Sequence, residues 1–388
     1  MARQQLPRGI TKVAVANRRT GKLEDRWRVK LNPVDAAGER HQVNRSFTTE
    51  REARAFHSET LGAMQAGTYV AVSKRTVEQA CKAWLESRHN LKATTRTGYA
   101  TALQPVRDRY GSTRLQALTK DDLDSLVTDL RAGEVEGRRR AFKARTVNKM
   151  LRVLEQVIDS ELKQGNVVRN VAALVERIAV DDAAEYRTLT EAEMLRVLDH
   201  QCRERHLWTL ALYGLRRGEI AGLRWENVDL KAGTVTISEA RVYAGPDLGV
   251  VVETPKSKRS RRTLPMPPDV VKALKAARRA QRAEKVALGP AYAGGEYVAC
   301  DEAGRPYDPT WISDAWDRML KKLKIDRVRL HDARHTCGTL MHLQGVPIAV
   351  ISAWLGHASA AFTLATYVHS QDDALKAAGQ SLRPVEAI

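Results

Sequence analysis

The chain has 388 residues, 43% of them apolar, and its 64 Lys and Arg against 46 Asp and Glu give a formal net charge of +18. This length provides for two or three domains, and the charge indicates a polyanionic partner such as duplex DNA, although a basic protein without such a partner has the same composition. No apolar run approaches 20 residues and the first residues lack a signal-peptide pattern, which excludes a membrane protein and predicts a cytoplasmic one.

Residues 1–70 predict a three-stranded sheet followed by a helix. Apolar and polar residues alternate over 12–17, 26–31 and 42–47, with turn residues between these stretches. A helix is expected to begin after Thr49, where Glu52 completes a capping box, and to end near Gly67. Residues 1–75 hold 15 Lys and Arg against seven Asp and Glu. A sheet with basic residues on one face can lie in a DNA major groove, but it can also be a solvated basic face.

Residues 73–178 predict a helical domain. Apolar residues recur at three- and four-residue steps over 76–88, 93–110, 119–131, 144–164 and 171–178. Thr119 and Asp122 form a further capping box. The charged tract 133–143, which includes Arg138, Arg139 and Arg140, is either a disordered loop or a strap that contacts phosphates.

Residues 185–388 predict a mixed α+β domain after a short acidic linker at 181–185. A capping box at Thr190 and Glu193 opens helices that run to about residue 223. Strands are expected at 234–238, 250–254 and 262–265, with the last two forming a β-hairpin. Helices follow at 269–288, at 310–322 and from residue 331 onward, and 372–382 is helical in a C-terminal tail. The fold class is therefore multidomain and mainly α with small β-sheets.

Four cysteines are scattered along the chain with no Cys-x-x-Cys pair: Cys81, Cys202, Cys300 and Cys337. This spacing predicts reduced, mostly buried thiols and no zinc site.

The chemistry of the chain is concentrated in short motifs of its second half. Gly-Leu-Arg-Arg-Gly-Glu spans residues 214–219, Pro-Lys-Ser-Lys spans 255–258, and His-Asp-Ala-Arg-His-Thr spans 331–336. Leu-Gly-His follows at 355–357 and Tyr367 ten residues later. Together they supply an oxygen nucleophile and a set of cationic or proton-donating groups, without a carboxylate ladder for a metal. Such a set suits metal-free cleavage of a phosphodiester, because arginines can neutralise the charge on its non-bridging oxygens.

In these motifs and their order, residues 189–369 resemble the tyrosine recombinases, and within them the integrases of phages and mobile elements. The resemblance implies an arm-type DNA-binding domain at 1–70, a helical core-binding domain at 73–178 and a tyrosine-recombinase catalytic domain with a C-terminal tail at 185–388. Here Ala333 stands where such proteins often have Leu, a change in packing that leaves the polar positions intact.

The resemblance also implies the role of each residue. Arg216 and Arg334 would clamp the scissile phosphate, with Arg217 as the rival of Arg216. Lys256, with Lys258 as its rival, would protonate the leaving 5′ oxygen. His357 would donate a hydrogen bond to the phosphate, and His331 would either hydrogen-bond the phosphate or assist proton transfer from the tyrosine. Tyr367 would be the nucleophile that forms a 3′-phosphotyrosyl bond, since Tyr297 and Tyr307 precede the histidine motifs. Glu219 is expected to orient an arginine and His335 to be structural.

The implied function is site-specific recombination of double-stranded DNA attachment sites by a homotetramer, through a four-way junction. No cofactor and no metal are expected, and accessory DNA-bending or directionality proteins are possible partners in a bacterial cytoplasm, at the nucleoid. Two alternatives stay open. A type IB topoisomerase uses similar chemistry without exchanging partners, and a noncatalytic DNA-binding regulator can share this fold.

Overall fold

The computed structural model describes residues 5–16, 22–34, 38, 40–134, 140–180, 187–254 and 261–357. The chain folds as two compact units, Met1–Asp182 and Ala183–Ile388. The expected domains 1–70 and 73–178 both fall in the first unit, and the boundary between them stays a prediction. The linker at 181–185 and the tail helix at 372–382 lie outside the described residues. None of the described helices combines the length and the apolar character needed to span a membrane.

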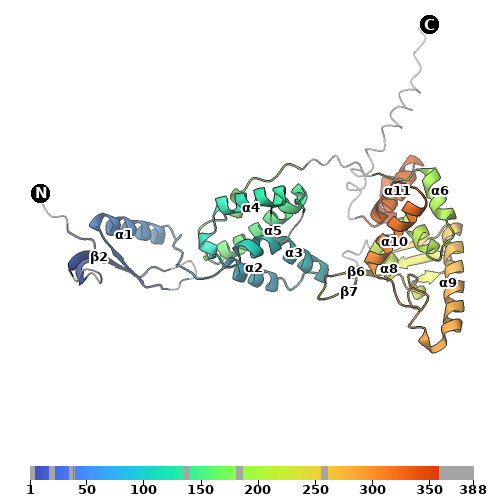
Figure 1. Cartoon of the computed structure of the whole chain (residues 1–388), viewed down its shortest axis with the longest axis horizontal. Helices are drawn as coiled ribbons and strands as arrows, with labels where there is room; N and C mark the ends of the chain where they lie inside the picture. Colours follow the sequence, from blue (N-terminus) through green and yellow to red (C-terminus); the bar gives the residue numbers. More distant parts are fainter. Residues whose placement is uncertain are drawn as a thin grey trace, which may run out of the picture. The chain divides into compact units, whose positions relative to one another are not determined.

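The first unit begins with an antiparallel sheet in the order β1-β2-β3, formed by Ile10–Ala16, Leu23–Leu31 and Val43–Phe47. Helix α1 (Glu50–Gln65) packs on this sheet, and the predicted capping box between Thr49 and Glu52 is present (Figure 1). The small core contains Val29 of β2 and Ala53 of α1, both fully buried. The predicted three strands and helix are thus confirmed.

Four helices follow, and each agrees with its prediction to within a few residues. They are α2 (Val77–Glu86), α3 (Ala93–Tyr110), α4 (Lys120–Ala132) and α5 (Ala144–Lys163) (Figure 1). The capping box of Thr119 and Asp122 is present as expected. Helix α5 supplies much of the core because its apolar residues return to one face every three or four positions, from Val147 to Ile158.

The helix predicted at 171–178 is wrong. The structure has only a 3-10 turn at Ala172–Leu174, after which the backbone at Val175 is extended. The side chain of Asn170 accepts hydrogen bonds from the backbone N–H of Ala172, and that of Asn148 bonds both the N–H and the carbonyl of Ile178. The N–H of Ile178, which a helix would have paired with the carbonyl of Leu174, thus bonds the side chain of Asn148, and the apolar residues pack on the core without helical periodicity.

The second unit combines helices with two small antiparallel sheets. Strands β4 (Val228–Asp229), β5 (Thr234–Ile237) and β8 (Arg262–Pro265) form one sheet, and β6 (Ala240–Tyr243) pairs with β7 (Val250–Glu253). The helices are α6 (Glu191–Asp199), α7 (Arg205–Leu212), α8 (Arg217–Gly222), α9 (Pro268–Leu288), α10 (Pro309–Lys322), α11 (Leu330–Leu343) and α12 (Ile348–Leu355).

Helix α7 lies at the centre of this unit, and every one of its residues from His206 to Leu212 is buried. It packs against both α9 and α11. Trp208 of α7 meets Trp316 of α10 edge to face, with 5.7 Å between ring centroids, and the indole N–H of Trp316 donates to the carbonyl of Val328. This core fixes the start of α11, which follows two residues after Val328.

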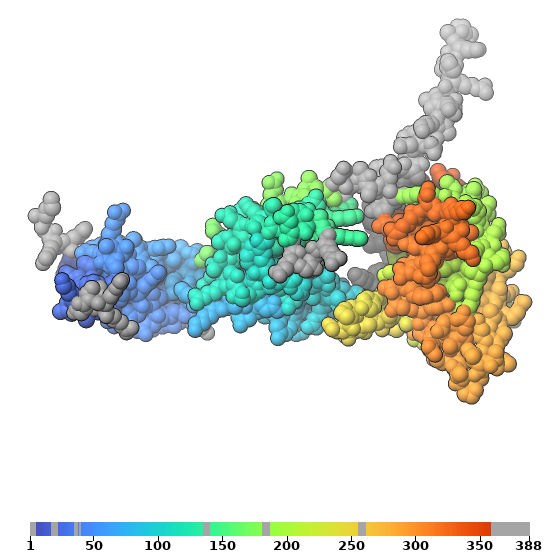
Figure 2. Space-filling model, viewed as in Figure 1, coloured from blue at the N-terminus to red at the C-terminus, as the bar shows by residue number. Residues whose placement is uncertain are grey.

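The predicted hairpin of strands 250–254 and 262–265 is also wrong. Strand β7 pairs with β6, and β8 pairs with β5, so the two segments belong to different sheets. Strand β6 has only four residues and gave no clear alternation in the sequence. Gly245 and Gly249, both at positive φ, form part of the turn that joins β6 to β7. The resulting β6–β7 hairpin stands out from the body of its unit (Figure 2). Lys256, expected at a hairpin tip, lies outside the described residues.

Candidate functional site

Three arginines converge on the C-terminal end of α12. Each donates a hydrogen bond to a different backbone carbonyl, and the three carbonyls belong to consecutive residues. Because consecutive carbonyls lie only a few ångströms apart, the three guanidinium groups share one site although they come from three separate segments of the chain. The pairs are Arg262 Nε with Trp354 O (2.7 Å), Arg334 Nη2 with Leu355 O, and Arg216 Nη2 with Gly356 O (2.8 Å).

The end of α12 is built to accept these cations. Its last carbonyls have no helical partners and carry the negative end of the helix dipole, which favours positive groups. Gly356 ends the helix at a φ of +61°, a left-handed conformation that suits glycine. The N–H of His357 then donates to the carbonyl of Ser352 at 3.0 Å, which fixes the backbone of His357 directly beside the arginines.

Arg216 stands at the N-cap of α8 and bonds Glu219 in two ways. Its backbone N–H donates to Glu219 Oε2 at 2.9 Å, and its Nη1 donates to Glu219 Oε1 at 2.8 Å. The side chain keeps 34% of its surface exposed, while that of Glu219 keeps only 7%. The carboxylate therefore holds the guanidinium on its buried side and leaves part of it accessible to a ligand.

Arg334 lies on α11 and is buried, with 1% of its surface exposed. Besides the carbonyl of Leu355, it donates to the carbonyl of Gly214, two residues before Arg216. Gly214 has a φ of +95°, and a Cβ atom there would lie 2.8 Å from Leu355 Cδ2. Only glycine fits both the conformation and the space, so this residue sets the position of a carbonyl that holds Arg334.

His331 precedes Arg334 by one helical turn on α11, as the sequence predicted. Its ring meets that of His335 edge to face, with 5.2 Å between centroids, while its outer side remains exposed. Loss of hydration on the inner side, together with the nearby His335 and Arg334, lowers the pKa of His331 to about 4. His335, expected to be structural, supports this ring.

His357 is buried and stands one residue after the carbonyl of Gly356. Burial, and then the positive charges of Arg334 and Arg216, lower its pKa to about 3. Both His331 and His357 are thus neutral at pH 7 and can act as hydrogen-bond donors without adding charge.

Arg217, the rival of Arg216, points to a different surface. Its Nη1 contacts Ser313 Oγ on α10 at 3.2 Å. Four predicted site residues, Arg216, His331, Arg334 and His357, come together in the structure. Lys256, Lys258 and Tyr367 lie outside the described residues, so their positions stay predictions.

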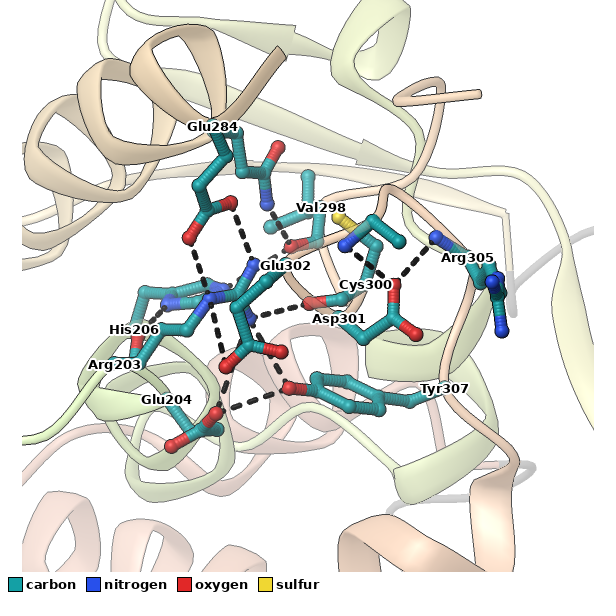
Figure 3. A network of polar contacts seen from close by, with 12 residues as sticks. Arg203, Glu204, His206, Glu284, Val298, Cys300, Asp301, Glu302, Arg305 and Tyr307 are labelled. Carbon is teal, nitrogen blue, oxygen red and sulfur yellow. Dashed lines mark hydrogen bonds and ion pairs between the residues drawn. The ribbon is translucent and has the colours of Figure 1, made fainter. Parts of the chain in front are cut away.

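The rival tyrosines are engaged elsewhere. The hydroxyl of Tyr307 donates to Glu204 at 3.0 Å and accepts a hydrogen bond from Arg203 (Figure 3). Its ring stacks on that of Trp311. Burial, followed by the charge of Glu204, raises the pKa of Tyr307 above its ordinary value. The hydroxyl of Tyr297 accepts a hydrogen bond from Arg224. These partners of Tyr307 and Tyr297 all lie outside the arginine site.

Arg262 is the site residue that the sequence did not single out. Its Nη1 and Nη2 donate to the two carboxylate oxygens of Glu219 at 3.0 and 2.9 Å, and both side chains are 7% exposed. Burial would raise the pKa of Glu219, but the hydrogen bonds and charge of Arg262, with the charge of Arg216, lower it to about 2. Arg262 lay in a run of basic residues, 258–262, in which nothing local distinguishes it.

A second basic surface lies on the N-terminal sheet. Trp27, Val29 and Leu31 of β2 pack toward the core, so the alternate residues point to the opposite face. These are Arg26, Arg28 and Lys30. That face thus carries three positive charges along the middle strand, of which Arg26 also pairs with Glu24 at 3.4 Å.

Comparisons with known proteins agree with these features. Residues 185–374 match the model of the phage integrase family. A XerC-like tyrosine recombinase of Caldanaerobacter subterraneus subsp. tengcongensis is 30% identical over 166 residues, which cover 40% of this chain and 42% of the relative. The alignment thus spans less than half of that protein.

Two further similarities extend over more of the chain. An integrase of Streptomyces ambofaciens is 24% identical over 88% of this chain and 89% of its own length. The solved structure of the Tn1549 transposon integrase in complex with transposon right end DNA superposes with a TM-score of 0.64, at 19% identity, over 79% of this chain and 99% of that one. The fold class expected from the sequence is confirmed.

Proposed function

Since this chain belongs to the phage integrase family of tyrosine recombinases, we propose that it breaks and rejoins DNA at specific sites through a covalent bond to Tyr367. The observation that carries the proposal is the arginine site at the end of α12. There Arg216 and Arg334 bind adjacent carbonyls next to His357. A site with two fixed cations and neutral donors can stabilise a phosphate whose charge increases during attack.

Each residue then has a role in the reaction. Arg216, partly exposed, contacts one non-bridging oxygen of the scissile phosphate, and Arg334 contributes its charge from the interior. Neutral His331 and His357 donate hydrogen bonds to the phosphate, and His331 can accept the proton of the attacking hydroxyl. Lys256 protonates the departing 5′ oxygen. The phosphotyrosyl bond at Tyr367 retains the energy needed for religation, because one phosphoester replaces another.

The basic face of the N-terminal sheet supports the assignment of residues 1–70 as a second DNA-binding domain. Arg26, Arg28 and Lys30 lie on alternate positions of one strand, so they can contact successive phosphates or base edges in a major groove. Residues 73–178 form the core-binding domain and 185–388 the catalytic domain in this proposal.

The proposed partner is double-stranded DNA that contains attachment sites. Complete exchange between two duplexes requires four strand cleavages, and each protomer supplies one Tyr367, so four copies act together through a four-way junction. Accessory bending or directionality proteins would assist in the cytoplasm of a bacterium, at the nucleoid. Binding should weaken steeply with salt, because the positive surfaces displace counterions from DNA.

Covalent trapping tests this function. Labelled, nicked duplexes of candidate attachment sites are incubated with the wild type and with Tyr367→Phe in EDTA, then denatured. We expect a denaturation-resistant protein–DNA adduct for the wild type and none for the variant. Absence of an adduct on DNA that the protein binds would favour a noncatalytic regulator. Relaxation of supercoiled DNA without strand transfer to a second duplex would favour a type IB topoisomerase.

A further inference from the structure

Arg262 belongs to the arginine site, but the proposed reaction gives it no role. Its guanidinium forms two hydrogen bonds with Glu219 and a third with the carbonyl of Trp354. Strand β8 begins with this residue, and the segment that carries Lys256 ends just before it. Arg262 thus connects strand β8, the carboxylate of Glu219 that binds Arg216, and the end of α12.

Glu219 has its hydrogen-bonding capacity divided between two arginines. Oε1 accepts from Nη1 of Arg216 and from Nη1 of Arg262, while Oε2 accepts from Nη2 of Arg262 and from the backbone N–H of Arg216. A carboxylate offers about four acceptor positions, so these four donors fix its orientation. Without Arg262, Glu219 would be free to rotate and to pair with Arg216 alone.

The same guanidinium also fixes the carbonyl side of the site. By binding Trp354 O, Arg262 holds the first of the three consecutive carbonyls, and the next two bind Arg334 and Arg216. One buried side chain therefore controls both supports of Arg216.

We propose that Arg262 is a positioning residue for the strand-cleavage reaction, which aims the guanidinium of Arg216 at the scissile phosphate through Glu219 and the end of α12. It does not touch the DNA. This assignment rests on the proposed function, because it needs the cleavage step whose rate it affects. Lysine cannot replace Arg262, since an ammonium cannot donate to both oxygens of Glu219 and to Trp354 in the same plane.

Arg203 provides a matched control in the same unit. Its Nε and Nη2 donate to the two oxygens of Glu284 at 2.8 and 2.9 Å, and its Nη1 donates to the carbonyl of Cys300 at 2.6 Å (Figure 3). Like Arg262, it donates two hydrogen bonds to one carboxylate and one to a backbone carbonyl, and it donates a further one to the hydroxyl of Tyr307. These partners of Arg203 all lie outside the arginine site.

The test is a double-mutant cycle. Single-turnover rates of covalent adduct formation on nicked DNA are measured for the wild type, Arg262→Lys, Arg216→Ala and the double variant. We expect Arg262→Lys to slow cleavage by about 10- to 100-fold in the wild-type background and by no more than about twofold when Arg216 is already absent. Arg203→Lys should reduce the rate by a similar small factor in both backgrounds. Equal losses from Arg262→Lys in both backgrounds would overturn the assignment.

A substrate with a methylphosphonate at the scissile position gives an independent readout that a loss of folding would not mimic. The methyl group removes the charge that Arg216 would neutralise. The defect of Arg262→Lys, relative to the wild type, should shrink on this substrate in parallel with that of Arg216→Ala. A defect of the same size on both substrates would contradict a role through Arg216. If the wild type forms no adduct on ordinary DNA that it binds, the proposed function fails, and the assignment of Arg262 fails with it.

Discussion

The second unit contains two arginine clusters that are built from similar hydrogen bonds but differ in how much of the arginine they leave exposed. In the Arg203 cluster, Glu284, the carbonyl of Cys300 and the hydroxyl of Tyr307 surround one guanidinium, which ties together α7, α9 and the turn before α10 (Figure 3). In the site at the end of α12, Glu219 binds two arginines, and one of them, Arg216, keeps a third of its side chain exposed.

The difference explains how the proposed binding site can form around a structural ion pair. In the Arg203 cluster the guanidinium is used inside the protein on each of its three nitrogens. At Glu219 a second arginine, Arg262, takes over much of the pairing, so Arg216 is held by the carboxylate but keeps capacity for an external anion. A phosphate can then occupy a site whose donors are already oriented, which is the condition for electrostatic stabilisation of a transition state.

The largest expected contrast comes from removing one arginine of each cluster. Arg216→Ala should slow covalent cleavage by about 10²- to 10³-fold and lower the free energy of unfolding by only about 1 kcal/mol, because Glu219 keeps Arg262. Arg203→Ala should lower the free energy of unfolding by about 2–3 kcal/mol, because the substitution leaves Glu284 without its buried partner. At a temperature where this variant is folded, it should cleave DNA at close to the wild-type rate. Urea denaturation and adduct kinetics measure the two quantities. Similar profiles for both variants would remove the distinction between the clusters.

Gly214→Ala should produce the next largest effect. A Cβ atom at a φ of +95° would lie 2.8 Å from Leu355 and displace the carbonyl that holds Arg334. We expect a loss of about 2–3 kcal/mol in stability together with slower cleavage. Gly249→Ala is the control, because Gly249 has a φ of +60° and open space around it. That variant should lose about 1 kcal/mol and cleave normally. Equal losses for both variants would mean that backbone strain alone, and not the position of Arg334, explains the effect.

Acid should weaken both clusters through their histidines. The pKa of buried His206 is lowered to about 4 by burial, and that of His357 to about 3, against an ordinary value near 6.5. Below pH 6.5 the unfolded chain therefore binds protons that the folded chain does not, and stability decreases as pH falls. Each histidine should contribute a loss of about 1 kcal/mol between pH 7.5 and 5.5.

Urea denaturation of the wild type, His206→Asn and His357→Asn at the two pH values measures this dependence. Each variant should show a smaller loss on acidification than the wild type. An unchanged loss in His357→Asn would show that His357 takes up its proton over the same pH range in the folded and unfolded chains, and its lowered pKa would then be wrong.

The smallest expected effect is that of Arg217→Ala. Arg217 is exposed in its contact with Ser313 and points away from Glu219. We expect a change in stability within about 0.5 kcal/mol and cleavage within a few-fold of the wild type, compared with the large loss in Arg216→Ala. A loss in Arg217→Ala as large as that in Arg216→Ala would reverse the choice between these neighbours.

Much of the secondary structure could be predicted because its signals are local. The capping boxes at Thr49, Thr119 and Thr190 lie within three residues of their partners, and all three are present in the structure. The two errors came from contacts between distant residues. Asn148 bonds Ile178 across 30 positions in place of a helical partner, and β8 pairs with β5 instead of with the strand that directly precedes it in the chain.

The sequence by itself determined the residue types of the site and their order along the chain: Arg216, the His331 and Arg334 pair, and His357. Their spacing within each motif is a local property, so it could be read without a fold. Only the tertiary structure decided that Arg262 joins them, because its bonds to Glu219 and Trp354 cross 43 and 92 positions. In the sequence, nothing separates a buried arginine of a basic run from its exposed neighbours. Tertiary packing removes Arg262 from water and brings the carboxylate of Glu219 and the carbonyl of Trp354 within hydrogen-bonding distance of it.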